Sequence, residues 1–179
     1  MNFVSKVGRK KMKNNLVKPE FISVRNTKTT GRGVFADQDI ESGSIIEECH
    51  FIVSGCPREI QDTELQRYIF CIFYDKNMGP EQNQELDFRT KFLLSINDEE
   101  IVDTFLDELK SLGYKDFNQI FSTATVLGYG MIYNHSQKNN IDYSIDYTDF
   151  CFRFTTNRKI FKDEELFINY DNPERKDIQ

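Results

Sequence analysis

Short apolar segments in which hydrophobic and polar residues alternate make up most of the patterned sequence. Alternation with a period of two is typical of strands that bury one face. Glycine, proline and small polar residues separate the segments, as they do in connecting turns. The strands that this pattern predicts lie at 21–24, 34–36, 45–53, 141–145, 150–156 and directly after a polar turn at 162–165.

The middle of the chain has a different pattern, because apolar residues at 101–112 recur at helical spacing. Asp98 or Asn97 can cap the start of this predicted helix, and Gly113 can end it. A second, weaker helical pattern covers 116–127.

Three further segments lie before that helix. The polar stretch 75–89 contains Gly79-Pro80 and predicts a loop. Residues 92–96 predict one more short strand. The run 68–74 is too uniformly apolar to lie in water, and its periodicity fits a buried strand as well as a helical turn.

Together these elements predict one α+β domain, mainly β, with a helical insertion. A length of 179 residues suits a single domain with its own core. We expect a flexible basic arm at 1–18, the folded domain at 19–172 with its insertion at about 75–127, and a short tail at 173–179.

Charge is unevenly spread along the chain. The residues before Glu20 include six lysines or arginines and no acid, whereas the rest carries 29 acids against 17 bases. An acidic body favours a cationic peptide partner over a phosphate backbone, so nucleic acid is not an expected partner. We interpret the basic arm as a solvated terminus, with contact to nucleic acid as the alternative.

The sequence contains no apolar run near the roughly eighteen residues that a membrane helix needs, so no membrane partner is expected. The N-terminus also lacks the apolar core of a secretory signal. We therefore expect an intracellular protein, cytoplasmic or, in a eukaryotic host, nuclear.

The four cysteines form no C-x-x-C pair, which favours buried thiols over a zinc or redox motif. Cys49, His50 and Cys56 could supply metal ligands, but neighbouring strand residues point to opposite faces. No metal site is predicted.

Two stretches hold the residues best suited to chemistry. Residues 128–136 gather glycines, aromatics and one of only two histidines between apolar segments. About thirty residues later, 164–171 is an apolar alternation opened by acids and closed by a tyrosine beside an aspartate. Of the nearby acids, Asp163, Glu164 and Glu165 predict a solvated turn, and Glu47 and Glu48 are candidates for contact with a cationic substrate.

In three ordered motifs the chain resembles the SET-domain protein lysine methyltransferases. The motifs are Gly31-Arg32-Gly33 with 34–46, Leu127-Gly128-Tyr129-Gly130 with Asn134-His135-Ser136, and 165–170, which matches the closing motif with the family's active-site tyrosine. The second motif is especially similar to compact microbial members. The resemblance covers about residues 20 to 172.

This resemblance implies a SET fold, in which several short curved sheets surround a threaded C-terminal segment. It also implies transfer of methyl groups from S-adenosyl-L-methionine to the side-chain amine of lysine in a basic protein or peptide substrate. The alternatives are a catalytically inactive SET-like module that binds peptide or cofactor, and methylation of a small molecule or of another side chain.

Residue roles are likewise implied by the resemblance, although strand-end tyrosines are most often core residues and paired glycines ordinary turn residues. Tyr170 is the expected catalytic residue. The expected cofactor-binding residues are Gly31, Arg32, Gly33, Tyr133, Asn134, His135 and Tyr170. The expected substrate-binding residues are Tyr129, Phe167 and Ile168.

The chain departs from the family pattern after the Asn-His-Ser motif, where Gln137, Lys138 and Asn139 replace a segment that usually contains proline. Loss of proline loosens this turn, and Asn140 is kept as a further candidate. The tail also lacks the cysteines that close the lysine channel in many members. We expect the C-terminal residues, the insertion or the second subunit of a homodimer to supply that wall.

Overall fold

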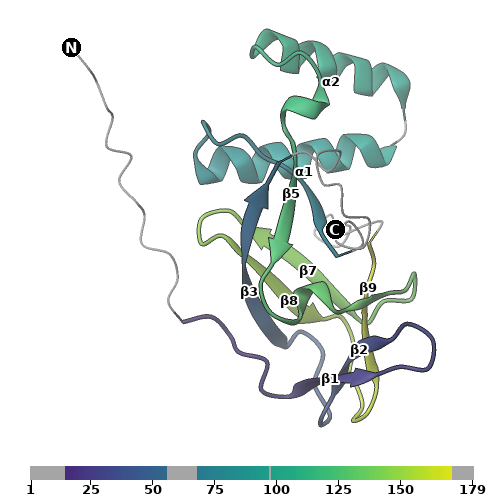
Figure 1. The fold of residues 1–179 in the computed structure, drawn as a ribbon. Helices are drawn as coiled ribbons and strands as arrows, with labels where there is room; N and C mark the ends of the chain where they lie inside the picture. Colours follow the sequence, from purple (N-terminus) through teal and green to yellow (C-terminus); the bar gives the residue numbers. More distant parts are fainter. Residues whose placement is uncertain (1–14, 56–67, 97, 171–179) are drawn as a thin grey trace.

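The computed structural model describes residues 15–55, 68–96 and 98–170, which form two curved β-sheets with helices at one end (Figure 1). One sheet has the order β1-β2-β9-β6, built from Ile22–Asn26, Arg32–Ala36, Glu165–Ile168 and Asn134–His135. The other has the order β4-β5-β3-β8-β7, built from Phe70–Phe73, Phe121–Val126, Ile45–Ser54, Cys151–Thr156 and Ile141–Asp146. The predicted α+β, mainly β class is confirmed.

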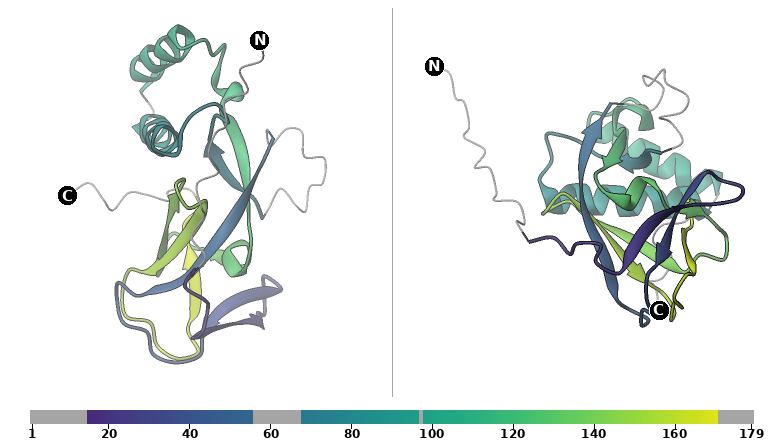
Figure 2. Two further views of the ribbon diagram at one scale, coloured as in Figure 1. Left: turned by 90° about the vertical axis from the view of Figure 1, so that its left-hand side faces the viewer. Right: turned by 60° about the horizontal axis from the view of Figure 1, so that its bottom comes forward.

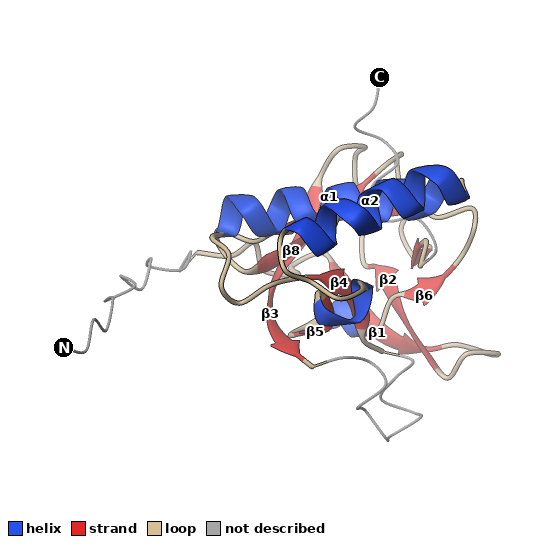
Figure 3. Cartoon of the chain, turned by 90° about the horizontal axis from the view of Figure 1, so that it is seen from above, coloured by secondary structure: helices blue, strands red, loops and turns tan. Residues whose placement is uncertain are grey.

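Two α-helices stack at the end of the molecule opposite β1 and β2 (Figure 2). They are α1 (Pro80–Ile96) and α2 (Glu99–Ser111), and two short 3₁₀ helices are η3 (Phe117–Gln119) and η4 (Tyr129–Met131). Viewed from above, α1 and α2 lie in front of the strands (Figure 3). Among the described residues, no helix has both the length and the apolar character needed to cross a bilayer.

The predicted caps of α2 are confirmed. The Asp98 carboxylate accepts hydrogen bonds from the backbone N–H groups of Glu100 and Ile101 at 3.0 and 3.2 Å. Gly113 follows the helix with a left-handed φ of +97°, which glycine adopts without steric cost. The alternative cap, Asn97, lies outside the described residues.

The predictions on either side of α2 are wrong. Helix α1 covers most of the stretch expected to be a loop at 75–89 and all of the strand expected at 92–96. The helix expected at 116–127 is replaced by η3 and β5. Strand β5 pairs with both β3 and β4, and these pairings outweigh a weak helical pattern in a segment that contains β-branched residues.

A polar buried face explains why α1 has no amphipathic pattern. Asn83, Asp87 and Thr90 are buried on this face beside Leu86. The Asp87 carboxylate accepts a hydrogen bond from the backbone N–H of Phe73 in β4 at 2.7 Å. Buried polar groups are stable when they are hydrogen-bonded, so this face holds the helix on the sheet without an apolar stripe.

The remaining strand predictions are confirmed. Strands β7 and β8, both predicted, pair antiparallel, with Tyr143 opposite Phe154. The open assignment at 68–74 is decided in favour of a strand, because β4 pairs with β5. Whether the closing segment is threaded through the chain stays a prediction. The expectations for 1–14 and for the tail concern residues outside those described.

One apolar core joins the two sheets. Tyr133, Phe152 and Phe154 lie in it together with Leu166 and Ile168 of β9, and all five are at most 1% exposed. A smaller cluster containing Phe105 and Leu109 lies under the helices. The closing strand is therefore packed into the main core, which fixes the residues on either side of it.

Candidate active site

Strand β9 brings together three segments that are far apart in the sequence. It pairs antiparallel with β2, where Val34 lies opposite Leu166. It pairs parallel with β6, where Asn134 lies opposite Phe167 and His135 opposite Ile168. The glycine motif, the Asn-His-Ser motif and the closing motif are thus neighbours in one sheet.

Asn134 and Gly33 meet at the centre of this arrangement. The Asn134 Nδ2 group lies 2.7 Å from Glu165 Oε1, 2.9 Å from the Arg32 carbonyl oxygen and 2.9 Å from Thr30 Oγ1. A Cβ atom on Gly33 would lie 2.3 Å from Glu165 Oε1 and 3.0 Å from Asn134 Nδ2. The missing side chain of Gly33 thus allows other groups of the chain to approach its backbone closely.

Gly31 differs from Gly33, because its φ of +82° places it in the left-handed region and a Cβ there would meet nothing within 4 Å. The Arg32 side chain between the two glycines is exposed. Glu165 is half-buried and bonded to Asn134, so its assignment to a solvated turn is wrong. Glu164 is also bonded, to the backbone N–H of Phe161 and to Arg158.

Tyr170 contacts the Asn-His-Ser segment through both its backbone and its side chain. Its hydroxyl donates a hydrogen bond to the Tyr133 carbonyl oxygen at 2.6 Å. Its backbone N–H donates to His135 Nδ1 at 3.1 Å, and the two rings lie 5.1 Å apart. Burial of the hydroxyl, and secondly the charge of a nearby Tyr68, raise the pKa of Tyr170.

Two residues beside these contacts were not among the predicted site residues. Tyr68 lies close enough to Tyr170 to affect its pKa, and its only signal was membership of the aromatic run 68–74. Glu165 approaches Gly33 and Asn134 from the neighbouring strand. Neither motif spacing nor periodicity marks such contacts.

The expected substrate residues of β9 lie on different faces. Ile168 is fully buried in the core, whereas Phe167 is half-buried on the opposite face of the strand. Asn140, 1% exposed, accepts a hydrogen bond from the Phe167 backbone N–H at 2.7 Å and donates one to the Glu165 carbonyl oxygen at 2.8 Å. Asn140 thereby holds the backbone of β9.

Tyr129 and Tyr133, which precede Asn134, are both hydrogen-bonded to a buried carboxylate. Glu47 of β3 is 2% exposed, and it accepts hydrogen bonds from the Tyr129 backbone N–H at 2.9 Å and the Tyr133 hydroxyl at 3.1 Å. Burial raises the pKa of both Glu47 and Tyr133. Glu48 is also buried and is paired with Arg153 at 2.9 Å. Both acids are engaged within the protein, which argues against contact with a substrate.

The family model of the SET domain matches residues 31–171. The chain belongs to the SET-domain family. No curated protein matches it in sequence.

Among solved structures, this SET domain is similar to a proposed histone methyltransferase of Plasmodium falciparum, with 21% identity and a TM-score of 0.49 over 84% of this chain and 97% of that one. It is also similar to a humanized mutant of the Chaetomium thermophilum Polycomb Repressive Complex 2 bound to the inhibitor GSK126, with 16% identity and a TM-score of 0.49 over 86% of this chain. A third structure, an active Polycomb Repressive Complex 2 in the basal state, has 16% identity and a TM-score of 0.49 over 84% of this chain. The SET domain spans 15% of each matched Polycomb chain.

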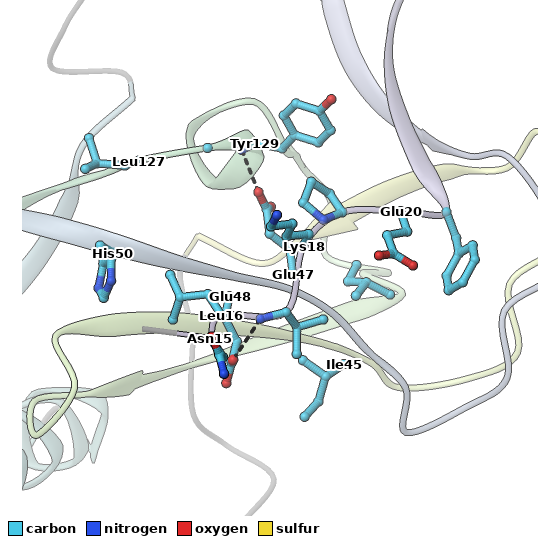
Figure 4. Close-up of a pocket in the computed structure, with 15 residues that line it drawn as sticks. Asn15, Leu16, Lys18, Glu20, Ile45, Glu47, Glu48, His50, Leu127 and Tyr129 are labelled. Atoms are coloured by element: carbon cyan, nitrogen blue, oxygen red, sulfur yellow. Dashed lines mark hydrogen bonds between the residues drawn. The ribbon is translucent and has the colours of Figure 1, made fainter. Parts of the chain in front are cut away.

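A cavity of about 970 Å³ lies between residues 15–21, the first half of β3 and residues 127–129 (Figure 4). Its lining includes Tyr129, Glu47 and Glu48. Gly33, Asn134 and Tyr170 are not among its lining residues. The expected substrate residue Tyr129 therefore borders this cavity, and its backbone N–H is bonded to Glu47.

The cysteines of the described part of the SET domain are thiols: Cys49 and Cys151 are buried and Cys71 is exposed, so the expectation of burial is wrong for Cys71. Burial raises the pKa of the Cys49 thiol strongly. Across residues 15–55, 68–96 and 98–170, no group of three or more His, Cys, Asp or Glu side chains is placed to hold a metal ion.

Proposed function

We propose that this SET domain transfers a methyl group from S-adenosyl-L-methionine to the side-chain amine of a lysine in a protein substrate. The observation that carries the proposal is the position of Tyr170. Its hydroxyl is held on the Tyr133 carbonyl at 2.6 Å, at the end of the strand that also places Glu165 against Gly33 and Asn134. Membership of the SET-domain family supports the same conclusion.

The residues around Asn134 suit the amino-acid end of the cofactor. Oxygen acceptors from Glu165, Arg32 and Thr30 surround the Asn134 Nδ2 group, and an ammonium group needs the same kind of neighbours. The exposed guanidinium of Arg32 is suited to a carboxylate. Gly31, Gly33, Asn134 and His135 are thus the residues proposed to hold the cofactor with Arg32. When bound, S-adenosyl-L-methionine supplies an electrophilic methyl group on a sulfonium sulfur.

Hydrogen bonding gives Tyr170 a defined role toward the amine. Its single hydroxyl proton is donated to the Tyr133 carbonyl, so its oxygen faces other groups as an acceptor. An N–H of a neutral lysine amine can donate to that oxygen, which directs the nitrogen lone pair away from the tyrosine. Such orientation lowers the entropic part of the barrier to transfer.

A neutral amine is required, because a protonated lysine has no lone pair. The ordinary lysine pKa of about 10.4 leaves little neutral amine at pH 7. Partial burial near Tyr170, with Tyr133 and Phe167 on the same segments, would lower the lysine pKa by desolvation. The raised pKa of Tyr170 keeps its hydroxyl protonated, and therefore bonded to the Tyr133 carbonyl, in the same pH range.

Transfer of tritium from labelled S-adenosyl-L-methionine to a mixture of basic proteins tests the proposal. We expect incorporation with the wild type and a loss of about 100-fold with Tyr170→Phe, while calorimetry should still detect cofactor binding. Tyr114→Phe is a matched control, because it removes a hydroxyl bonded to Asp75 near the helices. Equal activity of the wild type and Tyr170→Phe would refute the assignment of Tyr170. Cofactor binding without transfer to any lysine would favour a binding module.

A further inference from the structure

A single buried carboxylate holds both ends of the segment that leads to Asn134. Glu47 Oε1 accepts the backbone N–H of Tyr129, the first residue of η4, at 2.9 Å. Glu47 Oε2 accepts the hydroxyl of Tyr133 at 3.1 Å. The residue before η4 is Gly128, which offers no side-chain cap, so Glu47 from β3 supplies one.

The segment lies directly against this carboxylate. A Cβ atom on Gly128 would lie 2.6 Å from Glu47 Oε1 and 2.9 Å from Cys49 Sγ. The φ of Gly128, +115°, is also one that other residues rarely adopt. Close contact and hydrogen bonding therefore leave little freedom for residues 128–133 to shift relative to β3.

Tyr133 transmits this restraint to the candidate active site. Its hydroxyl end is bonded to Glu47, while its backbone carbonyl accepts the Tyr170 hydroxyl at 2.6 Å. Its ring is clamped in the core, 4.8 Å from the ring of Phe154. A displacement of Tyr133 would redirect the Tyr170 hydroxyl, which is bonded to its carbonyl.

We propose that Glu47 is a positioning residue, which sets the place of the Tyr133 carbonyl and thereby the direction of the Tyr170 hydroxyl. The proposal rests on the proposed methyl transfer for its kinetic consequence. A buried carboxylate is costly unless hydrogen bonds compensate it, and here the compensating donors in residues 128–133 come from both ends of that segment.

The chemistry of the two contacts predicts which substitution is tolerated. In Glu47→Gln, the amide oxygen can accept from Tyr129 and the amide N–H can donate to the Tyr133 oxygen, because a hydroxyl both donates and accepts. Glu47→Met has a similar length but offers no comparable acceptor. It would leave the Tyr129 N–H and the buried Tyr133 hydroxyl without this acceptor and release the segment.

Two measurements separate positioning from simple loss of stability. The first is kcat and KM for methyl transfer. The second is the NMR signal of the Tyr170 ζ carbon in protein labelled with ¹³C-tyrosine, assigned with Tyr170→Phe. Asp87→Leu is the matched control, because Asp87 is another buried carboxylate, bonded to Phe73 and Lys91 near the helices.

We expect Glu47→Met to lower kcat about 100-fold, to leave KM for the cofactor nearly unchanged and to shift the Tyr170 signal. Glu47→Gln should restore both readouts toward the wild type. Asp87→Leu should lower the unfolding temperature but leave kcat and the Tyr170 signal as they are. If Glu47→Met does not fold, Tyr133→Phe breaks the same link and should shift the Tyr170 signal.

A folded Glu47→Met with the wild-type Tyr170 signal and kcat would overturn the inference, and so would a Tyr170 signal unmoved in Tyr133→Phe. A wild type that transfers no methyl group would instead refute the proposed function. In that case the Tyr170 signal would still decide whether Glu47 positions the tyrosine.

Discussion

Gly33→Ala is the substitution whose effect the structure specifies most closely. Gly33 lies in β2 and does not have a positive φ, so its backbone conformation accepts alanine. The cost is steric, because the new Cβ would lie 2.3 Å from Glu165 Oε1, 2.9 Å from Thr27 Cγ2 and 3.0 Å from Asn134 Nδ2. Glu165 has the most flexible of these side chains and must move first.

The size of the destabilisation follows from the interactions that Glu165 loses when it moves. Moving its carboxylate breaks the 2.7 Å hydrogen bond from Asn134 Nδ2, and a hydrogen bond to a charged group contributes about 1.5–3 kcal/mol. Overpacking against Thr27 costs about 1–3 kcal/mol, but water can solvate the half-buried carboxylate once it moves. We expect a net loss of about 2–3 kcal/mol in the free energy of unfolding, which lowers the unfolding temperature by roughly 5–10 °C.

Thermal unfolding and calorimetry with S-adenosyl-L-methionine measure the two consequences. Gly43→Ala is the control for backbone strain, since Gly43 has a φ of +79° and a Cβ there would meet nothing within 4 Å. It should lower stability by about 1–2 kcal/mol without changing cofactor affinity. Gly33→Ala should weaken cofactor binding at least about tenfold, because Asn134 loses its fixed orientation. Wild-type stability and cofactor affinity in Gly33→Ala would show that the contacts of Gly33 do not organise a cofactor site.

Three further predictions concern the scaffold. Asn140→Ala removes the bonds to the β9 backbone and should lower the free energy of unfolding by about 2–4 kcal/mol in denaturant titrations. Asp98→Ala removes the α2 cap and should lower it by about 1 kcal/mol, with methyl transfer unchanged. Hydrogen bonding to Arg158 lowers the pKa of Glu164 below 4.5, so this pair stabilises the fold above that pH. The unfolding temperatures of the wild type and Arg158→Met should therefore differ at neutral pH and converge as the solution is acidified through the folded pKa.

The elements that the sequence predicted well are those that bury one apolar face and expose the other. The hairpin of β7 and β8 alternates because one face packs in the core, and α2 carries both an apolar stripe and caps. Helix α1 was missed because its buried face is polar, and Asn83 and Asp87 on that face are bonded to Asp75 and Phe73 on other segments. Periodicity reports only apolar burial, so a helix that docks by hydrogen bonds has no such pattern.

The candidate site shows the same limit. Asn134, His135 and Tyr170 were predicted because each lies within a short, continuous sequence motif. Glu47 was a candidate for contact with a cationic substrate, yet it is bonded to Tyr133, 86 positions later in the chain. No spacing rule links such residues, because the contact exists only once β3 and the segment before β6 have assembled. Supporting residues of this kind are visible only in three dimensions.

The register of β9 decides whether the motifs form one site. This strand spans only Glu165–Ile168, so its pairing with β2 and β6 specifies the register weakly on its own. A slip by one residue would expose Leu166 and Ile168, which are fully buried, and turn Glu165 away from Gly33. Asn140 is a second determinant of the register. Its side-chain amide can form hydrogen bonds with the backbone groups of Glu165 and Phe167 only in the observed register. The burial of Leu166 and Ile168 and the hydrogen bonds of Asn140 therefore together place Tyr170 beside Tyr133. None of these three side chains takes part in the proposed reaction.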